Sequence, residues 1–115
     1  ETILQATSRE TEEEIGVKIM EGDLIQKAVL HFSFDGKSEW NQECHVFLVK
    51  KWKGEPVETD EMKPEWFSID RLPFEKMWID DPHWLPKVLS GKKLEASFTF
   101  DADGKAILQS NIIEK

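Results

Sequence analysis

The stretch SRETEEEIGV, residues 8–17, constrains the fold more than any other part of the chain. It extends a run with few helix-breaking residues that starts at Thr2, and Gly16 is typical of the residue just after a helix because it tolerates positive φ. We therefore predict a helix over 2–15. Its candidates for a buried face form only a weak apolar stripe, made up of Ile3, Leu4, Ala6, Thr7 and Thr11.

The acidic side chains of this helix lie where a helix tolerates them least. Residues three or four apart share a face, so Glu10, Glu13 and Glu14 project together while Glu12 points elsewhere. Like charges at this spacing cost roughly 0.2–0.5 kcal/mol per pair, and acids near the C-terminal end oppose the helix dipole at roughly 0.3–1 kcal/mol each. Arg9 offsets only part of this. The face is either a plain solvated surface or a place where a divalent cation supplies positive charge.

Length, charge and cysteine content limit the class of protein. The 115 residues suit one domain spanning 1–115, and the net charge of −8 argues against a surface that binds duplex nucleic acid. No apolar run is long enough to cross a membrane. Cys44 is the only cysteine, so no internal disulfide can form, and a reducing compartment such as the cytoplasm is expected.

The rest of the chain carries mainly strand and turn signals. Apolar stretches predict strands at 27–34 and 43–52, a short strand and turn within 65–74, and a closing hairpin around the DADG turn at 101–104. A second helix is predicted over 80–91. We expect Asp80 or Asp81 to cap its N-terminus, Pro86 to lie in its first turn and Gly91 to end it. The pattern predicts an α+β fold.

A known motif covers the first seventeen residues. Seven positions, Glu1, Arg9, Glu10, Glu13, Glu14, Gly16 and Val17, match the spacing of the Nudix box, G-x5-E-x7-R-E-U-x-E-E-x-G-U, from its first glutamate onward. Thr11 stands where the box has a bulky aliphatic residue, and the opening glycine would precede Glu1. The chain therefore resembles the Nudix hydrolase family, and we expect a copy that is truncated at its N-terminus.

By this resemblance the fold is a mixed β-sheet sandwiched between α-helices. Glu10 and Glu14 are expected to bind Mg²⁺ or Mn²⁺ against a diphosphate, and Glu13 is a third ligand or the base that deprotonates the attacking water. Arg9 is expected to orient the glutamates, paired with Glu1. A monomer is expected, with pairing through an exposed sheet edge if early strands are truly absent.

Residues 54–86 resemble, more narrowly, family members that hydrolyse oxidised purine nucleoside triphosphates. The matching pieces are PVE-x-DEM-x-P, WF, LPF, MW-x-DD and W-x-P. The match implies that Glu61 is an extra metal ligand, the alternative being a surface acid in a polar loop. It also implies a role in cleaning the nucleotide pool and so in avoiding DNA damage.

The same resemblance implies a base-binding pocket. The Trp78 indole gives a flat face for stacking, and the adjacent carboxyls of Asp80 and Asp81 can share a proton, so that one donates to a base carbonyl while the other accepts. Alternatively, one aspartate caps the second helix and Trp78 belongs to the core; one aspartate can also cap while the other reads the base. Further pocket residues, with ordinary core as the alternative, are Phe32, Phe34 and Trp84.

The predicted function is a pyrophosphohydrolase that converts oxidised purine nucleoside triphosphates such as 8-oxo-dGTP to the monophosphate and pyrophosphate. Two alternatives remain: a Nudix hydrolase of another nucleoside diphosphate derivative, and a truncated, non-catalytic module that binds nucleotide or protein. The expected partner is a nucleotide, with neither duplex nucleic acid nor a membrane. His31, His45 and His83 lack metal-ligand spacing, and we interpret them as structural.

Overall fold

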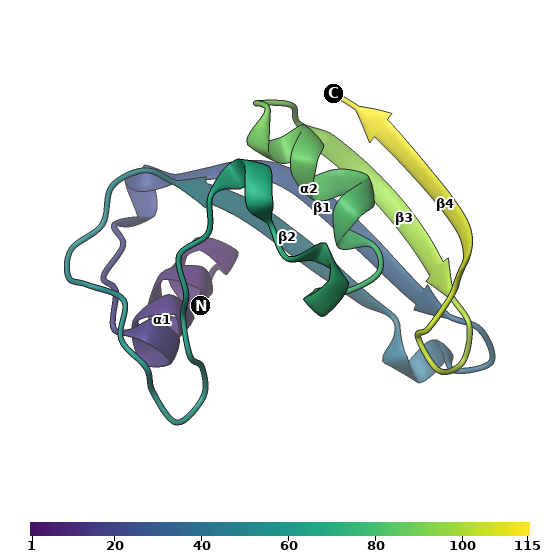
Figure 1. Ribbon diagram of the computed structural model, residues 1–115, viewed down its shortest axis with the longest axis horizontal. Coiled ribbons are helices and arrows are strands. Elements are labelled where there is room, and N and C mark those ends of the chain that lie inside the picture. Colours follow the sequence, from purple (N-terminus) through teal and green to yellow (C-terminus); the bar gives the residue numbers. More distant parts are fainter. The chain divides into compact units, whose positions relative to one another are not determined.

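The computed structural model describes residues 1–115 and contains two α-helices and a four-stranded sheet (Figure 1). The sheet order is β2-β1-β3-β4, with β1 parallel to β3 and β3 antiparallel to β4. The predicted α+β class with a mixed sheet is therefore confirmed. Neither helix is long and apolar enough to cross a membrane. The elements are α1 (Ile3–Ile15), β1 (Leu24–Phe34), β2 (Gln42–Val49), α2 (Asp81–Leu89), β3 (Leu94–Phe100) and β4 (Ile107–Glu114).

The chain folds as two compact units. Unit 1 comprises Glu1–Ile25 and Phe47–Ser68, and unit 2 comprises Gln26–Val46 and Ile69–Lys115. Unit 1 therefore contains α1 and the polar loop that follows β2. Unit 2 contains α2, β3, β4 and most of β1.

Local capping, more than packing, defines α1. The Thr2 hydroxyl accepts the Gln5 N–H, and the Gln5 side chain accepts the Thr2 N–H, which forms a capping box. Gly16 ends the helix in the left-handed conformation, with a φ of 74°. No residue of α1 is buried, and Ile3, a candidate for its buried face, is 50% exposed. The apolar stripe is therefore as weak as the sequence indicated.

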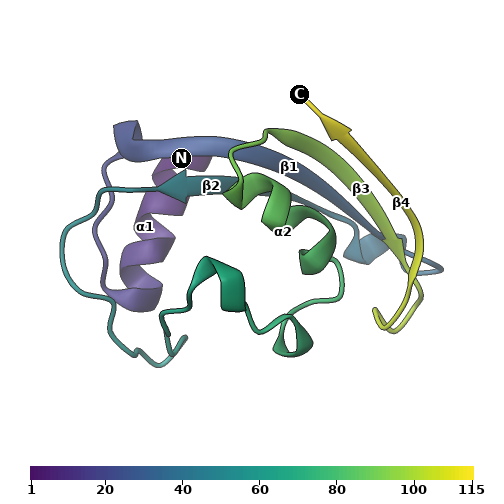
Figure 2. The same cartoon turned by 45° about the horizontal axis from the view of Figure 1, so that its top comes forward.

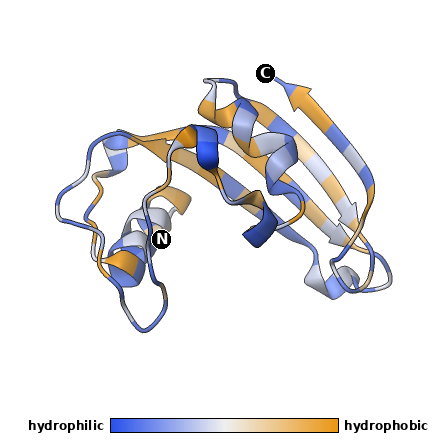
Figure 3. Cartoon of the chain, viewed as in Figure 1, coloured by the Kyte–Doolittle hydropathy of each residue, from blue (hydrophilic) through white to orange (hydrophobic).

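The core of unit 2 lies between α2 and one face of the sheet (Figure 2). Trp84 and Val88 of α2 are buried, and every second residue of β3 is buried as well. The parallel register places Leu30 of β1 beside Ala96 of β3, so both strands contribute to the same apolar face. Hydrophobic residues recur along these strands (Figure 3). This packing holds α2 against the sheet within unit 2.

The strand predicted within 65–74 is wrong. The other predicted strands and the closing hairpin are confirmed, with small shifts at their ends. This segment instead contains a 3₁₀ turn at Ile69–Arg71 and the first residue of another at Phe74–Lys76. Trp66 is 70% exposed, so it does not pack as a strand residue would, and Pro73 has no N–H to give to a ladder.

The position predicted for Pro86 is also wrong. α2 begins at Asp81 with Pro82 in its first turn, so Pro86 lies inside the helix. An interior proline removes a backbone hydrogen bond and costs about 3 kcal/mol. Burial of Trp84 and Val88 against the sheet offsets that cost, because each large apolar side chain contributes about 1.5–3 kcal/mol on burial.

Candidate functional site

One arginine organises the acidic face of α1. Arg9 binds the Glu1 carboxylate at 2.6–3.1 Å and the Glu13 carboxylate at 3.0 and 3.2 Å, while its contact with Glu10 is longer, at 3.6 Å. The Arg9–Glu1 pair expected from the motif is thus present, and the hydrogen bond from Arg9 lowers the pKa of the Glu1 carboxyl. Arg9 makes no ion pair with Glu14, whose carboxylate stays free of it.

The loop that carries Glu61 is tied to the C-terminal end of α1. The Thr59 hydroxyl donates to the Glu14 carbonyl, and the Val57 N–H donates to the Ile15 carbonyl at 2.9 Å. The same Thr59 hydroxyl accepts the Glu61 N–H at 3.2 Å. These bonds satisfy carbonyls that the end of a helix leaves unpaired. They hold Glu61 in a turn attached to the end of the helix that carries Glu14.

The carboxylates of α1 suit a hard divalent cation. The side chains of Glu10 and Glu13 are 56% and 53% exposed, and carboxylate oxygens are the ligands that Mg²⁺ and Mn²⁺ prefer. No three carboxylate, imidazole or thiol groups of the structure converge in one metal-binding cluster. Mg²⁺ usually takes only one or two carboxylates together with water and substrate phosphates, so this open face fits the ion without a cage made by the protein alone.

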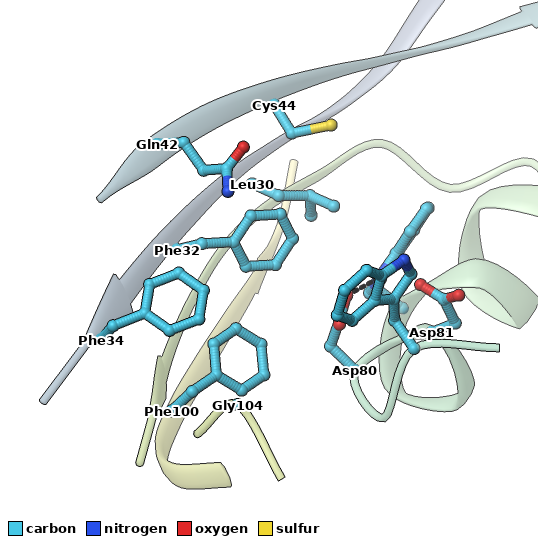
Figure 4. Close-up of a pocket in the computed structure, with 11 residues that line it drawn as sticks. Leu30, Phe32, Phe34, Gln42, Cys44, Asp80, Asp81, Phe100 and Gly104 are labelled. Atoms are coloured by element: carbon cyan, nitrogen blue, oxygen red, sulfur yellow. Dashed lines mark hydrogen bonds between the residues drawn. The ribbon is translucent and has the colours of Figure 1, made fainter. Parts of the chain in front are cut away.

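Unit 2 contains a cavity of about 310 Å³ whose walls are mainly apolar and include five aromatic side chains (Figure 4). Phe32 and Phe34 from β1 pack around Phe100 of β3, with ring centroids 5.7 Å and 5.3 Å from it. Near the start of α2, Trp84 is buried, whereas Trp78 is 75% exposed and so does not belong to the core. The cavity brings together all the pocket residues that the sequence indicated. Its lining is Leu30, Phe32, Phe34, Gln42, Cys44, Trp78, Asp80, Asp81, Trp84, Phe100 and Gly104.

The two adjacent aspartates lie in different environments. Asp80 is 3% exposed, and its carboxylate accepts the Trp84 indole N–H at 2.8 Å. Asp80 occupies the N-cap position of α2, but its side chain makes no capping hydrogen bond, so a side-chain capping role for Asp80 is wrong. Burial, and then the neighbouring Asp80 carboxylate, raise the pKa of Asp81 to about 6. The Asp80 carboxyl is held by Trp84, whereas the Asp81 carboxyl, which contacts Asp80 and the Trp78 backbone, keeps its proton up to about pH 6.

Two further polar residues of the cavity were not evident from the sequence. Gln42 and Cys44 are both exposed and both line the cavity wall formed by β2. Partial desolvation in the cavity wall raises the pKa of the Cys44 thiol, and the nearby aspartates add to this effect. Spacing by two residues places both side chains on one face of a strand. That signal was incomplete, because the strand predicted at 43–52 began after Gln42.

The three histidines contact carboxylates or core rings. His31 Nε2 lies 3.2 Å from Glu95, and His45 Nε2 lies 2.8 Å from Glu43. The His83 ring packs against an aromatic ring of the core, with centroids 6.3 Å apart. These contacts describe where the rings lie, and the structural role of the three histidines stays an interpretation.

Comparison with known sequences identifies related proteins. The family model described as NUDIX domain matches residues 1–88. The chain is 42% identical over 101 residues to the oxidized purine nucleoside triphosphate hydrolase of Danio rerio, which covers 87% of the chain and 62% of that protein. It is 37% identical over 116 aligned positions to the protein of the same name in Mus musculus, which covers 99% of the chain and 70% of that protein.

Comparison with solved structures concerns the fold. The crystal structure of the mMutator MutT protein from Bacillus halodurans superposes with a TM-score of 0.82, covering 97% of the chain and 74% of that protein. The sequence identity is 23%, so this likeness shows a shared fold and no more.

Proposed function

Because the chain belongs to the NUDIX domain family, as its sequence indicated, we propose that it is a divalent-metal-dependent hydrolase of oxidised purine nucleoside triphosphates. Water attacks phosphorus, one phosphoric anhydride bond breaks, and the products are the nucleoside monophosphate and pyrophosphate. The observation that carries the proposal is the aromatic cavity with Asp81, whose pKa is about 6, in its wall. The names of the zebrafish and mouse relatives support the same class of substrate.

The cavity suits a flat base with a polar edge. Trp78 presents an exposed indole, and stacking on such a ring contributes roughly 1–3 kcal/mol per base. When protonated, the Asp81 carboxyl can donate to a carbonyl oxygen of the base and accept from a ring N–H. We propose that Asp81 binds the polar edge of the base. Asp80, which lines the same cavity and is hydrogen-bonded to Trp84, would position Asp81. Phe32 would close the pocket from the β1 side.

The acidic helix would supply the metal site. We propose that Glu10 and Glu14 hold Mg²⁺ or Mn²⁺, with Glu61 as a further ligand and Glu13 as either a third helix ligand or the general base. When bound, such an ion neutralises phosphate charge and makes the attacking water more acidic. Arg9 holds Glu13 in one orientation through two hydrogen bonds, so it acts as a positioning residue.

Both units would form one domain. The family match at residues 1–88 includes parts of unit 1 and of unit 2, which supports this proposal. The chain spans 62% of the length of the zebrafish relative, so the activity of that whole protein is proposed, rather than assigned, for this chain.

A non-catalytic nucleotide-binding module is the second candidate function. Such a module would need only the cavity of unit 2 and no bound cation. The same aromatic cavity would then bind a nucleotide without turnover.

Pyrophosphate release separates these functions. With Mg²⁺ or Mn²⁺ present, we expect the protein to release pyrophosphate from 8-oxo-dGTP with a higher kcat/KM than from dGTP, because only the oxidised base offers a carbonyl at C8. Binding of 8-oxo-dGTP without release of any product would contradict the hydrolase and support the binding module. Turnover restricted to nucleoside diphosphate derivatives would indicate a different Nudix substrate.

The affinity for an oxidised guanine nucleotide should depend on the protonation of Asp81. The pKa of Asp81 is raised to about 6, so the free protein loses this proton as the pH rises through that value. If the bound base requires the protonated carboxyl, each binding event above pH 6 takes up one proton, and Kd rises by up to about tenfold per pH unit. Calorimetry of 8-oxo-dGMP binding in buffers of different ionisation enthalpy counts this proton. Asp81→Asn, which donates without titrating, should flatten the dependence; a Kd that is constant in the wild type would contradict the assignment.

A further inference from the structure

We propose that Gln42 is a specificity-determining residue, whose carboxamide reads the N7–C8 edge of an oxidised purine in the aromatic cavity; this inference rests on the function proposed above. Gln42 enters the cavity from β2, whereas Asp81 belongs to the start of α2. Figure 4 shows the amide on the sheet side of the cavity and the Asp81 carboxyl on the side of α2, with the Phe32 ring between them. A base between these walls would meet a polar group at each end.

Few polar groups of the cavity are free to bind a ligand. The Asp80 carboxylate already accepts the Trp84 indole N–H at 2.8 Å. The Cys44 thiol is only a weak hydrogen-bond donor. The Gln42 amide, by contrast, is exposed and offers both a strong donor and a strong acceptor. Gln42 and Asp81 are therefore the two side chains best able to recognise the polar edges of a base.

A carboxamide matches the oxidised edge of a purine better than the ordinary edge. In an 8-oxopurine, N7 carries a hydrogen and C8 carries a carbonyl, so a donor and an acceptor are adjacent. The amide oxygen of Gln42 accepts from N7–H while its nitrogen donates to the C8 carbonyl, which gives two hydrogen bonds. An ordinary purine has a bare N7 and a C8–H, so it forms one. The second bond favours the oxidised base, and Asp81 remains free to read the opposite edge.

The test measures base discrimination separately from turnover. We expect Gln42→Met and Gln42→Leu to weaken 8-oxo-dGMP binding by about 3- to 10-fold, the equivalent of one or two net hydrogen bonds, and to weaken dGMP binding less. The Kd ratio of the two monophosphates, measured by calorimetry without added metal, should therefore move toward unity. In turnover assays the same change should appear in KM, with kcat nearly unchanged. Gln109→Met, an exposed glutamine on β4 outside the cavity, is the matched control and should leave the ratio unaltered.

Every outcome decides between the two proposals. A Kd ratio that both Gln42 variants leave unchanged, with dGMP and 8-oxo-dGMP still bound, overturns the role of Gln42 even if the wild type is an active hydrolase. A ratio that falls in both variants supports it even if the wild type releases no pyrophosphate, which would overturn the hydrolase alone. Failure of the wild type to bind either monophosphate overturns the assignment of the cavity and the role of Gln42 together.

Discussion

Glu14→Gln should lower kcat for pyrophosphate release from 8-oxo-dGTP by on the order of 100-fold or more, with much less effect on nucleotide binding. Among Glu10, Glu13 and Glu14, which share one face of α1, Glu14 is the residue with which Arg9 makes no ion pair. The loop of Glu61 is hydrogen-bonded to the Glu14 carbonyl. Loss of a residue that only supports a metal ligand typically costs about 10–100-fold, so loss of a ligand itself should cost at least as much. Glutamine keeps the size of the side chain but removes the negative charge that a divalent cation requires.

Glu12→Gln is the control for this change. It makes the same substitution two residues away on the same exposed helix, but on a different face from Glu10, Glu13 and Glu14. We expect nearly full activity from it. Equal loss in both variants would point to a general effect of helix charge, and full activity of Glu14→Gln would exclude Glu14 as a metal ligand. Steady-state kinetics over a range of Mg²⁺ concentrations also tests whether the variant needs more metal.

Local sequence signals were sufficient for the acidic helix. Thr2 and Gly16 bound α1 because capping depends on side chains only a few residues away. The Arg9–Glu1 pair was expected from the resemblance to the Nudix box, and it is present. The converse holds within 65–74. Its apolar residues suggest a strand, but a strand also requires a neighbouring strand that forms hydrogen bonds with its backbone. The residues of the segment alone do not show whether such a strand is present.

The wall of the cavity was only partly predictable. Phe32 and Trp84 were indicated by resemblance, but Gln42 lines the cavity because β2 pairs beside β1 and starts one residue earlier than its apolar pattern. The two aspartates illustrate the same limit. Asp80 had two hydrogen-bonding options, the free N–H groups at the start of α2 and the indole of Trp84, and burial of both side chains selects the indole.

Asp80→Ala should lower the free energy of unfolding by about 2 kcal/mol, the largest stability effect that we expect at the cavity. The substitution removes a hydrogen bond between an indole N–H and a carboxylate, and such charge-assisted bonds contribute about 1.5–3 kcal/mol. It also leaves the N–H of Trp84 without its partner in a side chain that is 9% exposed. Loss of the repulsion between Asp80 and Asp81 offsets part of this cost. Urea unfolding at neutral pH measures the change as a lower midpoint at constant slope.

Two further variants separate the hydrogen bond from the charge. Asp80→Asn keeps an oxygen that can accept the Trp84 N–H, so it should recover most of the stability that alanine loses, whereas Asp103→Ala, at an exposed turn position, should cost little. Both Asp80 variants remove a carboxylate that raises the pKa of Asp81, so that pKa should fall toward its ordinary value near 3.8. The proton uptake that accompanies 8-oxo-dGMP binding should then begin at a lower pH. A variant that is as stable as the wild type, with the pH window of binding unmoved, would show that Asp80 neither anchors Trp84 nor tunes Asp81.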